Sequence, residues 1–398
     1  MSNENGMSTR AHVSLLSAAF MFVFMGAGAQ QVLLLPYLSR VTNWSDLQRS
    51  LVIATVYFSM TVFRLGNVYL LRRWPQWQCT IVGAAMYSFF TLAMFGIYFV
   101  PSYPLALLAA AIWGWGAAAM WMGTTMQILA LTDRAKRHGL GMGVLYGATH
   151  AGWMMGVVVL GMVFDSVQDS TPWTLYAAAT GLTLVGNAIL LLLPRRPEPL
   201  PEMPTVTDLI QIMSRAKAQI AAFLLFAASL AFGFVLGTFS DYVDAQYGAE
   251  WIWISALFYP AARLVLSFTS GLLTERVSHG SLLALGFFGG ALGMLVPLTI
   301  HHPLGLAVTA LMLGLLNGSV PVVSTALIGD SADSKRRPLI YGAMFTWRDL
   351  GVVVAVVAGK LLGLTTDNVA LVFGVFGMVF AICGVASLAL NRYAEERL

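Results

Sequence analysis

The sequence contains few charged residues and few cysteines, and these scarcities exclude several classes of protein. Only 10% of its 398 residues are charged, against about 25% in an average soluble domain. The two cysteines, Cys79 and Cys383, stand in or near separate apolar stretches, so the sequence predicts neither a disulfide framework nor a metal site. A Gly-x4-Gly-Lys-Ser/Thr loop for ATP phosphates is also absent, as is any Ser-His-Asp spacing. We therefore expect no cofactor and no enzymatic activity.

Apolar residues, in contrast, make up 58% of the chain and fall into twelve stretches of about 20 residues. Such a stretch, as a helix, spans the roughly 30 Å hydrocarbon core of a bilayer. The sequence therefore predicts an all-α membrane protein with 12 transmembrane helices. The predicted spans are Val13–Tyr37, Leu51–Leu71, Thr80–Val100, Leu105–Leu131, Leu140–Phe164, Trp173–Leu193, Ile220–Tyr242, Trp251–Leu273, Ser281–Ile300, Leu304–Ile328, Leu339–Leu362 and Val369–Leu390.

The basic residues predict how the chain is oriented in the membrane. If the N-terminus is cytoplasmic, 16 of the 22 Lys and Arg residues fall on the cytoplasmic side. This positive-inside bias predicts that both termini are cytoplasmic. The formal net charge of +4 then reflects these loops rather than binding to nucleic acid. Short loops and tails favour a bacterial inner membrane.

The spans divide into two sets of six. We expect an N-terminal six-helix bundle at residues 1–193, a cytoplasmic linker at 194–219 and a C-terminal six-helix bundle at 220–398. The linker is long and rich in Pro and Glu. Thr207 and Asp208 within it are typical of the cap of a short helix that lies against the membrane surface.

An internal repeat supports this division. In span five, His150 lies between two glycines nine residues apart, and in span eleven Asp349 lies between two glycines with the same spacing. Both pairs are offset by 199 residues, half the chain, which is typical of a duplicated transporter. The glycines are Gly143 and Gly152 in span five and Gly342 and Gly351 in span eleven.

A loop motif adds a resemblance to a known family. Residues 271–277 read Gly-Leu-Leu-Thr-Glu-Arg-Val, with Gly271, Glu275 and Arg276 at the positions of the glycine, acid and arginine that follow the second helix of each half in the major facilitator superfamily. In the first half the segment after Gly66 keeps the basic residues and lacks the acid. The layout of nearly the whole chain resembles that family. The resemblance implies two pseudo-symmetric bundles that rock about a central site, and a monomeric transporter of a small-molecule solute.

The same resemblance implies charge pairs that gate the cytoplasmic side. Arg72 or Arg73 can meet Asp133 at the ends of spans two and four, and Arg276 can meet one of two acids that follow span ten. Such pairs close one side in one conformation and break in the other. The gating candidates are Arg72, Arg73, Asp133, Gly271, Glu275, Arg276, Asp333 and, as the other acid, Asp330.

Ionisable residues inside the spans are costly and indicate function. Arg64 and Arg263 lie on the second helix of each half, where two guanidinium groups suit an anion, although alignment on the loop motifs places them about one turn out of register. Arg348 is a third candidate for substrate binding. Asp349 is the best candidate to carry a proton, with His150 as its pseudo-symmetric mate. Because Arg348 and Asp349 point about 100° apart on a helix, we expect them not to pair with each other.

Polar side chains on the first and fourth helices of each half suit hydrogen bonds to a polar solute at the bilayer midplane. Each is also typical of helix–helix contact. Tryptophans 113, 115, 121 and 153 crowd spans four and five, where they could stack a ring or simply pack. The polar candidates for substrate binding are Gln30, Gln31, Gln127 and Asn317.

We therefore expect a secondary transporter that moves a small polar or anionic solute by alternating access and is coupled to protons. Three alternatives remain open. Arg348-Asp349-Leu350-Gly351 is similar to a segment of many family exporters, which favours efflux of amphipathic drugs or metabolites by proton antiport. A facilitator without ion coupling is the second alternative. The incomplete first-half motif is compatible with the third, a regulatory or trafficking member that transports nothing.

Overall fold

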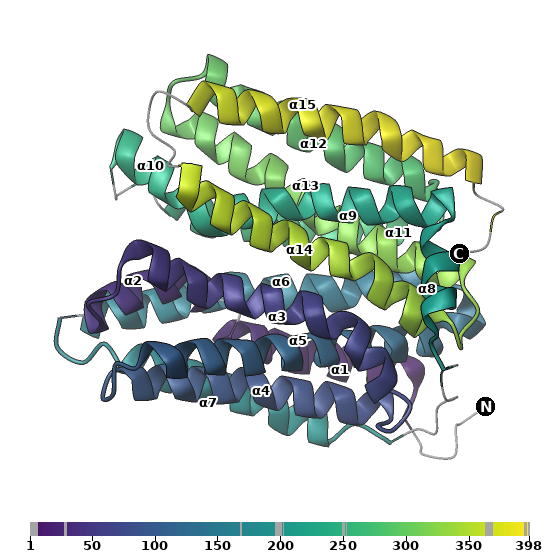
Figure 1. Ribbon diagram of the computed structural model, residues 1–398, viewed down its shortest axis with the longest axis horizontal. Coiled ribbons are helices and arrows are strands. Elements are labelled where there is room, and N and C mark those ends of the chain that lie inside the picture. Colours follow the sequence, from purple (N-terminus) through teal and green to yellow (C-terminus); the bar gives the residue numbers. More distant parts are fainter. Residues whose placement is uncertain are drawn as a thin grey trace.

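The computed structural model describes residues 7–27, 30–167, 169–195, 201, 203–248, 251, 253–362, 369–393 and 396. Within these residues, twelve helices are long and apolar enough to cross a membrane, which confirms the predicted all-α fold. They run broadly side by side in two bundles, one coloured purple to teal and the other teal to yellow (Figure 1). Large apolar side chains such as Met162, Leu285 and Val385 are exposed on the outside, as a surface in contact with lipid requires.

The first bundle consists of α1 (Thr9–Gly26), α2 (Gln30–Val41), α3 (Asp46–Leu70), α4 (Gln76–Ile97), α5 (Tyr103–Thr132), α6 (His138–Val167) and α7 (Thr174–Leu191). The second consists of α9 (Ala216–Phe234), α10 (Ser240–Tyr247), α11 (Trp253–Leu273), α12 (His279–Thr299), α13 (Pro303–Ser331), α14 (Arg337–Leu362) and α15 (Val369–Ala389). The first predicted span of each half is interrupted. It changes from α1 to α2 in the first half, and in the second half a π-helical turn at Val235–Phe239 joins α9 to α10.

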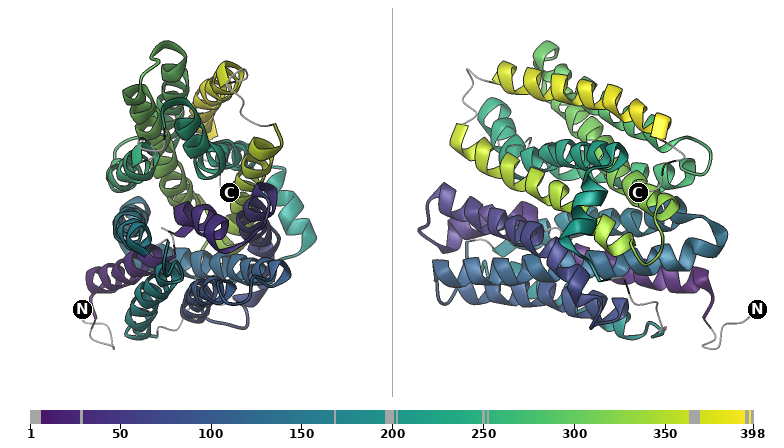
Figure 2. Two further views of the ribbon diagram at one scale, coloured as in Figure 1. Left: turned by 90° about the vertical axis from the view of Figure 1, so that its left-hand side faces the viewer. Right: turned by 45° about the vertical axis from the view of Figure 1, so that its right-hand side comes forward.

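A short helix, α8 (Val206–Met213), stands between the bundles and is visible beside both of them in Figure 2. Its cap is Thr205 rather than the predicted Thr207. The Thr205 side chain accepts from the Asp208 backbone N–H, and the Asp208 carboxylate accepts from Thr205 in return, which forms a capping box. These hydrogen bonds from Thr205 lower the pKa of Asp208 below its ordinary value.

The repeated glycines make the same contacts in both halves. A Cβ on Gly152 of α6 would collide with the Met21 carbonyl of α1, and a Cβ on Gly351 of α14 would lie 2.5 Å from the Phe226 carbonyl of α9. Each glycine therefore lets the fifth span of its half approach the first.

The other glycine of each pair faces the opposite half. A Cβ on Gly143 of α6 would lie 2.8 Å from the Ser267 carbonyl of α11, and one on Gly342 of α14 would lie 3.3 Å from the Arg64 carbonyl of α3. The interface between the halves thus consists of two equivalent helix pairs, α6 with α11 and α14 with α3. The offset of 199 residues relates α6 to α14, whereas the residues that these two helices face, Arg64 on α3 and Ser267 on α11, are 203 positions apart.

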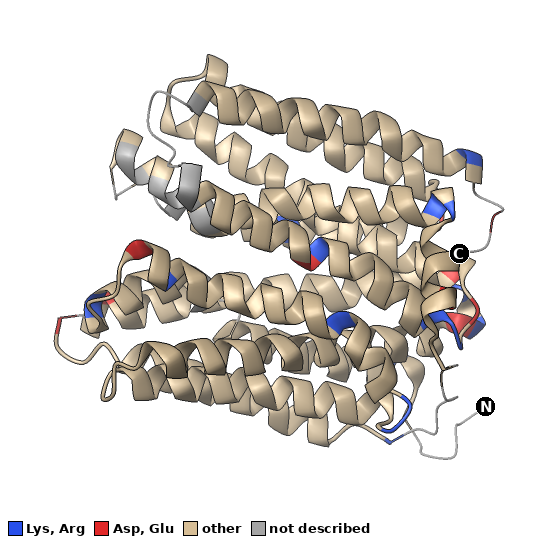
Figure 3. Cartoon of the chain, in the orientation of Figure 1, with Lys and Arg blue, Asp and Glu red and all other residues tan. Residues whose placement is uncertain are grey.

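Charged residues gather at the end of the molecule that carries both termini, and few lie where the bundles meet (Figure 3). We call this the basic end and define it by Arg72, Arg73, Arg137, Arg276 and Arg337. The far end of the helices is the opposite end. Because charges avoid the middle of every span, the few that do lie there need a specific explanation.

Candidate functional site

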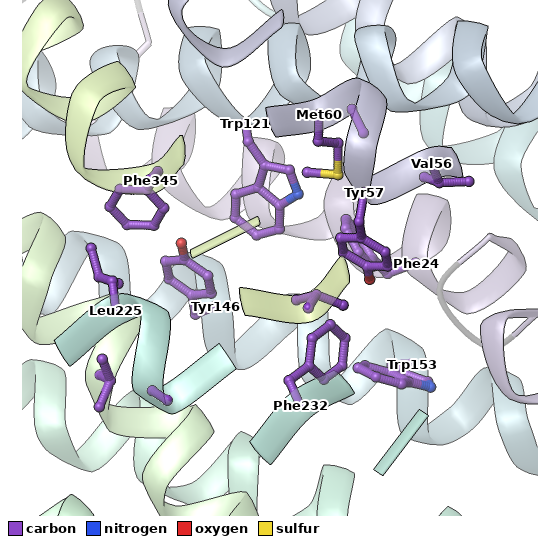
Figure 4. Packing of buried hydrophobic residues seen from close by; sticks show 14 of the residues in the cluster. Phe24, Val56, Tyr57, Met60, Trp121, Tyr146, Trp153, Leu225, Phe232 and Phe345 are labelled. Carbon is purple, nitrogen blue, oxygen red and sulfur yellow. The ribbon is translucent and has the colours of Figure 1, made fainter. Parts of the chain in front are cut away.

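A small cavity lies between the two bundles and is lined from both of them. Its volume is about 40 Å³, enough for a few water molecules. Figure 4 shows Trp121, Tyr57, Tyr146, Phe232 and Trp153 lying around this region on helices of both bundles. The lining residues are Phe24, Val56, Tyr57, Met60, Tyr87, Trp113, Ala117, Trp121, Tyr146, Thr149, His150, Trp153, Phe232, Arg263 and Arg348.

Beside the cavity, Arg64 of α3 and Asp349 of α14 form an ion pair that joins the two halves. The Asp349 Oδ2 atom lies 2.8 Å from Arg64 Nε and 2.6 Å from Arg64 Nη2. Both side chains have 0% exposure. Tyr341 adds a hydroxyl 3.4 Å from Arg64 Nη1. Because a buried ion that loses its partner is strongly destabilising, each of these two charges stabilises the other.

Arg348 also contacts Asp349. The prediction that these two neighbours do not pair with each other is therefore wrong. Its Nη1 donates to Asp349 Oδ1 over 3.3 Å. The long arginine side chain bends back across the 100° between adjacent helical positions. Asp349 thereby shares its two oxygens between two arginines, and Arg348 keeps a face on the cavity.

Arg263 of α11 has an entirely different environment. It is 4% exposed, and its guanidinium carbon lies 4.7 Å from the Trp153 ring centroid, 4.9 Å from Phe232 and 5.3 Å from Tyr259. These distances are in the range of cation–π attraction. Its Nε and Nη1 atoms have no acceptor among the described residues, and no ion pair there involves it.

His150 of α6 lines the same cavity and is 2% exposed. Neither ring nitrogen has a hydrogen-bond partner in the described part of the chain. It lies 199 residues before Asp349, and Arg64 lies 199 residues before Arg263. On the second helices, however, the glycine contacts pair Ser267 with Arg64, because Gly143 faces the Ser267 carbonyl where Gly342 faces the Arg64 carbonyl. Arg263 therefore lies about one turn away from the position equivalent to Arg64, as the alignment on the loop motifs indicated.

The interior around the cavity carries an excess of positive charge. Arg64, Arg263 and Arg348 contribute three positive charges. Within the described residues, the carboxylate of Asp349 offsets only one of them. Guanidinium groups stay protonated in proteins. The arrangement is therefore suited to a bound anion and repels a cation.

The predicted polar candidates lie elsewhere. Gln127 donates to the Thr80 hydroxyl over 2.8 Å, and Asn317 donates to the Leu313 carbonyl of its own helix over 3.2 Å. Neither lines the cavity. The side chains of Gln30 and Gln31 lie outside the described residues. Arg64 likewise contacts Asp349 rather than the cavity, so Arg263 and Arg348 are the two predicted substrate-binding residues that the structure places on it.

At the basic end, Asp133, which directly follows α5, pairs with Arg337 of α14 and not with the expected Arg72 or Arg73. The pairing is bidentate, with nitrogen–oxygen distances of 2.8 and 2.7 Å. Arg337 also donates to the Gly329 carbonyl over 2.8 Å. Arg72 and Arg73 are exposed and line a cavity of about 110 Å³ with Arg337. The contact thus joins the two halves instead of two helices of one half.

The second predicted gating motif contacts the first half too. Glu275 lies 3.6 Å from Arg137 across the interface, and its neighbour Arg276 is exposed. A Cβ on Gly271 would lie 2.5 Å from the Gly139 carbonyl. The expected partner of Arg276, Asp330, faces two histidines of α6 and α12 instead, and Asp333 is exposed after α13.

Sequence reasoning missed three features of these sites. Arg337 has no local signal that separates it from other loop charges, and His138, which lies 3.4 Å from Asp133 and 3.9 Å from Asp330, has none either. An offset of 199 residues relates His138 to Arg337, and this signal could have identified both. The chain has 47 aromatic residues, namely 11 Trp, 13 Tyr and 23 Phe. No sequence pattern separates those that line the cavity from the others.

Comparisons with known proteins agree on one family. The family model of the Major Facilitator Superfamily matches residues 16–257 and 221–397. A structure of the transporter FucP in the outward conformation is 13% identical, with a TM-score of 0.76, and the match covers 98% of this chain and 99% of that one. A variant of the E. coli fucose:proton symporter FucP is 14% identical with a TM-score of 0.70 over the same shares. No curated protein matches the sequence.

Proposed function

The chain belongs to the Major Facilitator Superfamily, and from this membership we propose that it is a proton-coupled secondary transporter of a small anionic solute. The observation that carries the proposal is the buried Arg64–Asp349 ion pair between the two halves, beside a cavity with excess positive charge. Transport follows from rocking of the two bundles about that cavity. The basic end is cytoplasmic in this proposal, because positive residues accumulate on that side.

Asp349 carries the proton in this mechanism. When its carboxylate takes up a proton, Arg64 and Arg348 lose their shared counter-charge. An anion in the cavity restores the balance, so proton and anion each favour binding of the other. Without either ligand the pair holds α3 against α14. With both bound, the same net charge is retained and the interface can separate.

Asp349 is surrounded by groups that make this exchange specific. Arg64 and Arg348 donate to its two oxygens, and the Tyr341 hydroxyl contacts Arg64. The ion pair at the basic end, Asp133 with Arg337, holds that side of the two halves together. We propose that it breaks when the solute is released to the cytoplasm and re-forms afterwards.

The direct test is the internal pH of proteoliposomes that hold the purified protein, as a panel of organic and inorganic anions is added outside. We expect one class of anion to drive protons inward in the wild type. Asp349→Asn should abolish that movement and keep the protein folded enough to bind the anion. Protein-free liposomes correct for anions that cross lipid as the neutral acid.

Other outcomes identify the alternatives. Anion flux that is insensitive to a protonophore would mean a facilitator without coupling. Proton movement driven by amphipathic drugs instead of anions would mean efflux by antiport. No flux for any solute, together with a stable co-purifying partner, would contradict transport altogether.

A further inference from the structure

The buried arginines on the second helices of the two halves, Arg64 and Arg263, differ in one respect that points to the chemistry of the solute. Arg64 on α3 faces α14, where Asp349 supplies a carboxylate 2.6 Å away. Arg263 on α11 faces α6 across the equivalent interface, where the residue 199 positions before Asp349 is His150. Each half therefore buries an arginine on its second helix, about one turn apart in register, and the described residues supply a carboxylate to only one of the two.

We propose that the solute provides the second carboxylate, and that it is a ring-bearing organic monoanion held by Arg263 and Arg348. This proposal rests on the proposed transport function and specifies its substrate. Two guanidinium nitrogens of Arg263 lack an acceptor within the described residues. A carboxylate, with two oxygens in one plane, matches the donor geometry of a guanidinium.

The cavity wall supplies positively charged donors and neutral polar groups, but no negative charge. No lining side chain is a carboxylate or a carboxamide. Trp153 Nε1 and Trp113 Nε1 are donors without a partner in the described part of the chain. A cation would meet two arginines, and a neutral polyol would leave the excess positive charge without a counter-charge. An anion satisfies both the charges and the donors.

The body of the solute is inferred from the rings. Eight of the fifteen lining residues are aromatic, and the rings of Phe232 and Trp153 contact each other edge to face at 5.7 Å. Flat aromatic walls favour a flat apolar partner, by offset stacking or edge contacts. Because the cavity is about 40 Å³, the solute is small, with a single ring, and the walls move apart to admit it.

The first experiment measures binding to the purified protein in detergent by calorimetry. Benzoate is the probe, with benzamide as its neutral isostere, benzylamine as the cation and acetate as the anion without a ring. We expect benzoate to bind at least tenfold more tightly than each of the other three, since charged hydrogen bonds and ring contacts each contribute on that order. If acetate binds as tightly as benzoate, the inference that the solute carries a ring is wrong. If benzamide binds as tightly, the inference that the solute is an anion is wrong.

Variants then test the residue assignment. Arg263→Gln should weaken benzoate binding by roughly tenfold to a hundredfold, whereas Arg392→Gln, an exposed arginine far from the cavity, should leave it unchanged. If Arg263→Gln fails to fold, Arg263→Lys retains the charge but not the paired donors, and it should weaken benzoate binding by a smaller factor. Unchanged binding in both Arg263 variants would contradict the proposal.

The sharpest variant is His150→Asp, which places a carboxylate where Asp349 has its own. We expect this carboxylate to pair with Arg263, raise the melting temperature without ligand and abolish benzoate binding. A lower melting temperature with intact binding would show that a carboxylate at position 150 does not reach Arg263, and would contradict the placement of the solute carboxylate there. Proton-coupled flux of a different anion would overturn the substrate class and leave the transport function standing. Benzoate binding without flux of any solute would support the assigned ligand and overturn the transport function.

Discussion

Arg64 and Arg263 are both buried on the second helix of their half, about one turn apart in register, and have opposite environments. The first has a carboxylate at 2.6 Å and no exposure. The second has three aromatic rings within 5.3 Å of its guanidinium carbon, and two of its nitrogens have no acceptor in the described residues. Duplication made the helices alike, and two differences separate the environments: a shift of about one turn between the arginines, and a histidine where the other half has an aspartate. The difference teaches that one arginine holds the halves together while the other is available to a ligand.

The same asymmetry recurs at the basic end. Arg337 and His138 are also 199 residues apart. Arg337 makes a bidentate pair with Asp133, at 2.7 and 2.8 Å, whereas His138 lies 3.9 Å from Asp330. In both layers of the interface, one helix pair carries an arginine–carboxylate ion pair and the other carries a histidine. The comparison therefore applies to the interface as a whole.

Removing the carboxylate from the Arg64 site should have the largest effect. Asp349→Asn leaves a fully buried guanidinium without its counter-charge, which costs about 3–5 kcal/mol of stability. Thermal unfolding in detergent measures this loss. The double variant Arg64→Gln/Asp349→Asn should recover part of it, because neither buried partner then remains alone. A double variant less stable than Asp349→Asn would contradict the pairing.

Breaking the lock at the basic end comes next. Arg337→Gln removes the two hydrogen bonds to Asp133, and a hydrogen bond to a charged group contributes about 1.5–3 kcal/mol. We therefore expect the basic end to open. A longer distance between spin labels at positions 73 and 276 would report this opening. Arg134→Gln, an exposed arginine at the same end, is the matched control and should not change the distance.

A methyl group in the interface should have a smaller effect of the same kind. A Cβ on Gly271 would lie 2.5 Å from the Gly139 carbonyl and 2.8 Å from the Gly143 Cα atom of the other half. Gly271→Ala should therefore destabilise the closed basic end by about 1–3 kcal/mol. Gly66 holds the corresponding place in the first-half motif, and its Cβ would find its nearest neighbour 3.7 Å away. Gly66→Ala should be neutral, and equal effects of the two alanines would refute the steric argument.

The smallest effect belongs to the exposed pair between the halves. Arg137 and Glu275 lie 3.6 Å apart with side-chain exposures of 57% and 32%. Solvent and salt screen such a pair, so Arg137→Gln should cost less than about 1 kcal/mol. The distance between the spin labels at positions 73 and 276, compared at low and high salt, measures the effect of this variant. A shift as large as that of Arg337→Gln would mean that burial does not decide which interface charges matter.

Much of the fold was predictable because it rests on composition. Apolar length specifies the spans, and a repeat of Gly143 and Gly152 at Gly342 and Gly351 indicates the duplication. The family model and the FucP structures confirm the resemblance in fold. The capping residue of α8 was misplaced by two positions, since Thr205 and Thr207 offer the same side chain and the helix start depends on backbone geometry.

The candidate site was predictable only in part. Buried charge alone singled out Arg64, Arg263, Arg348, Asp349 and His150, because each is costly within a membrane. Which of them pair with one another depends on how helices of the two halves face each other, and no local pattern records that. The pairing of Asp349 with Arg64, 285 residues away, required the structure. So did the finding that Gln127 and Asn317 lie away from the cavity.

The most direct test of the coupled mechanism is the number of protons taken up when the anion binds. Calorimetry of benzoate binding to the purified protein, in two buffers with different ionisation enthalpies, measures that number without interference from leakage across lipid. The account predicts net proton uptake, up to one proton for each benzoate, in the wild type and none in Asp349→Asn. Benzoate binding with no proton uptake in the wild type, or with the same uptake in Asp349→Asn, would contradict it.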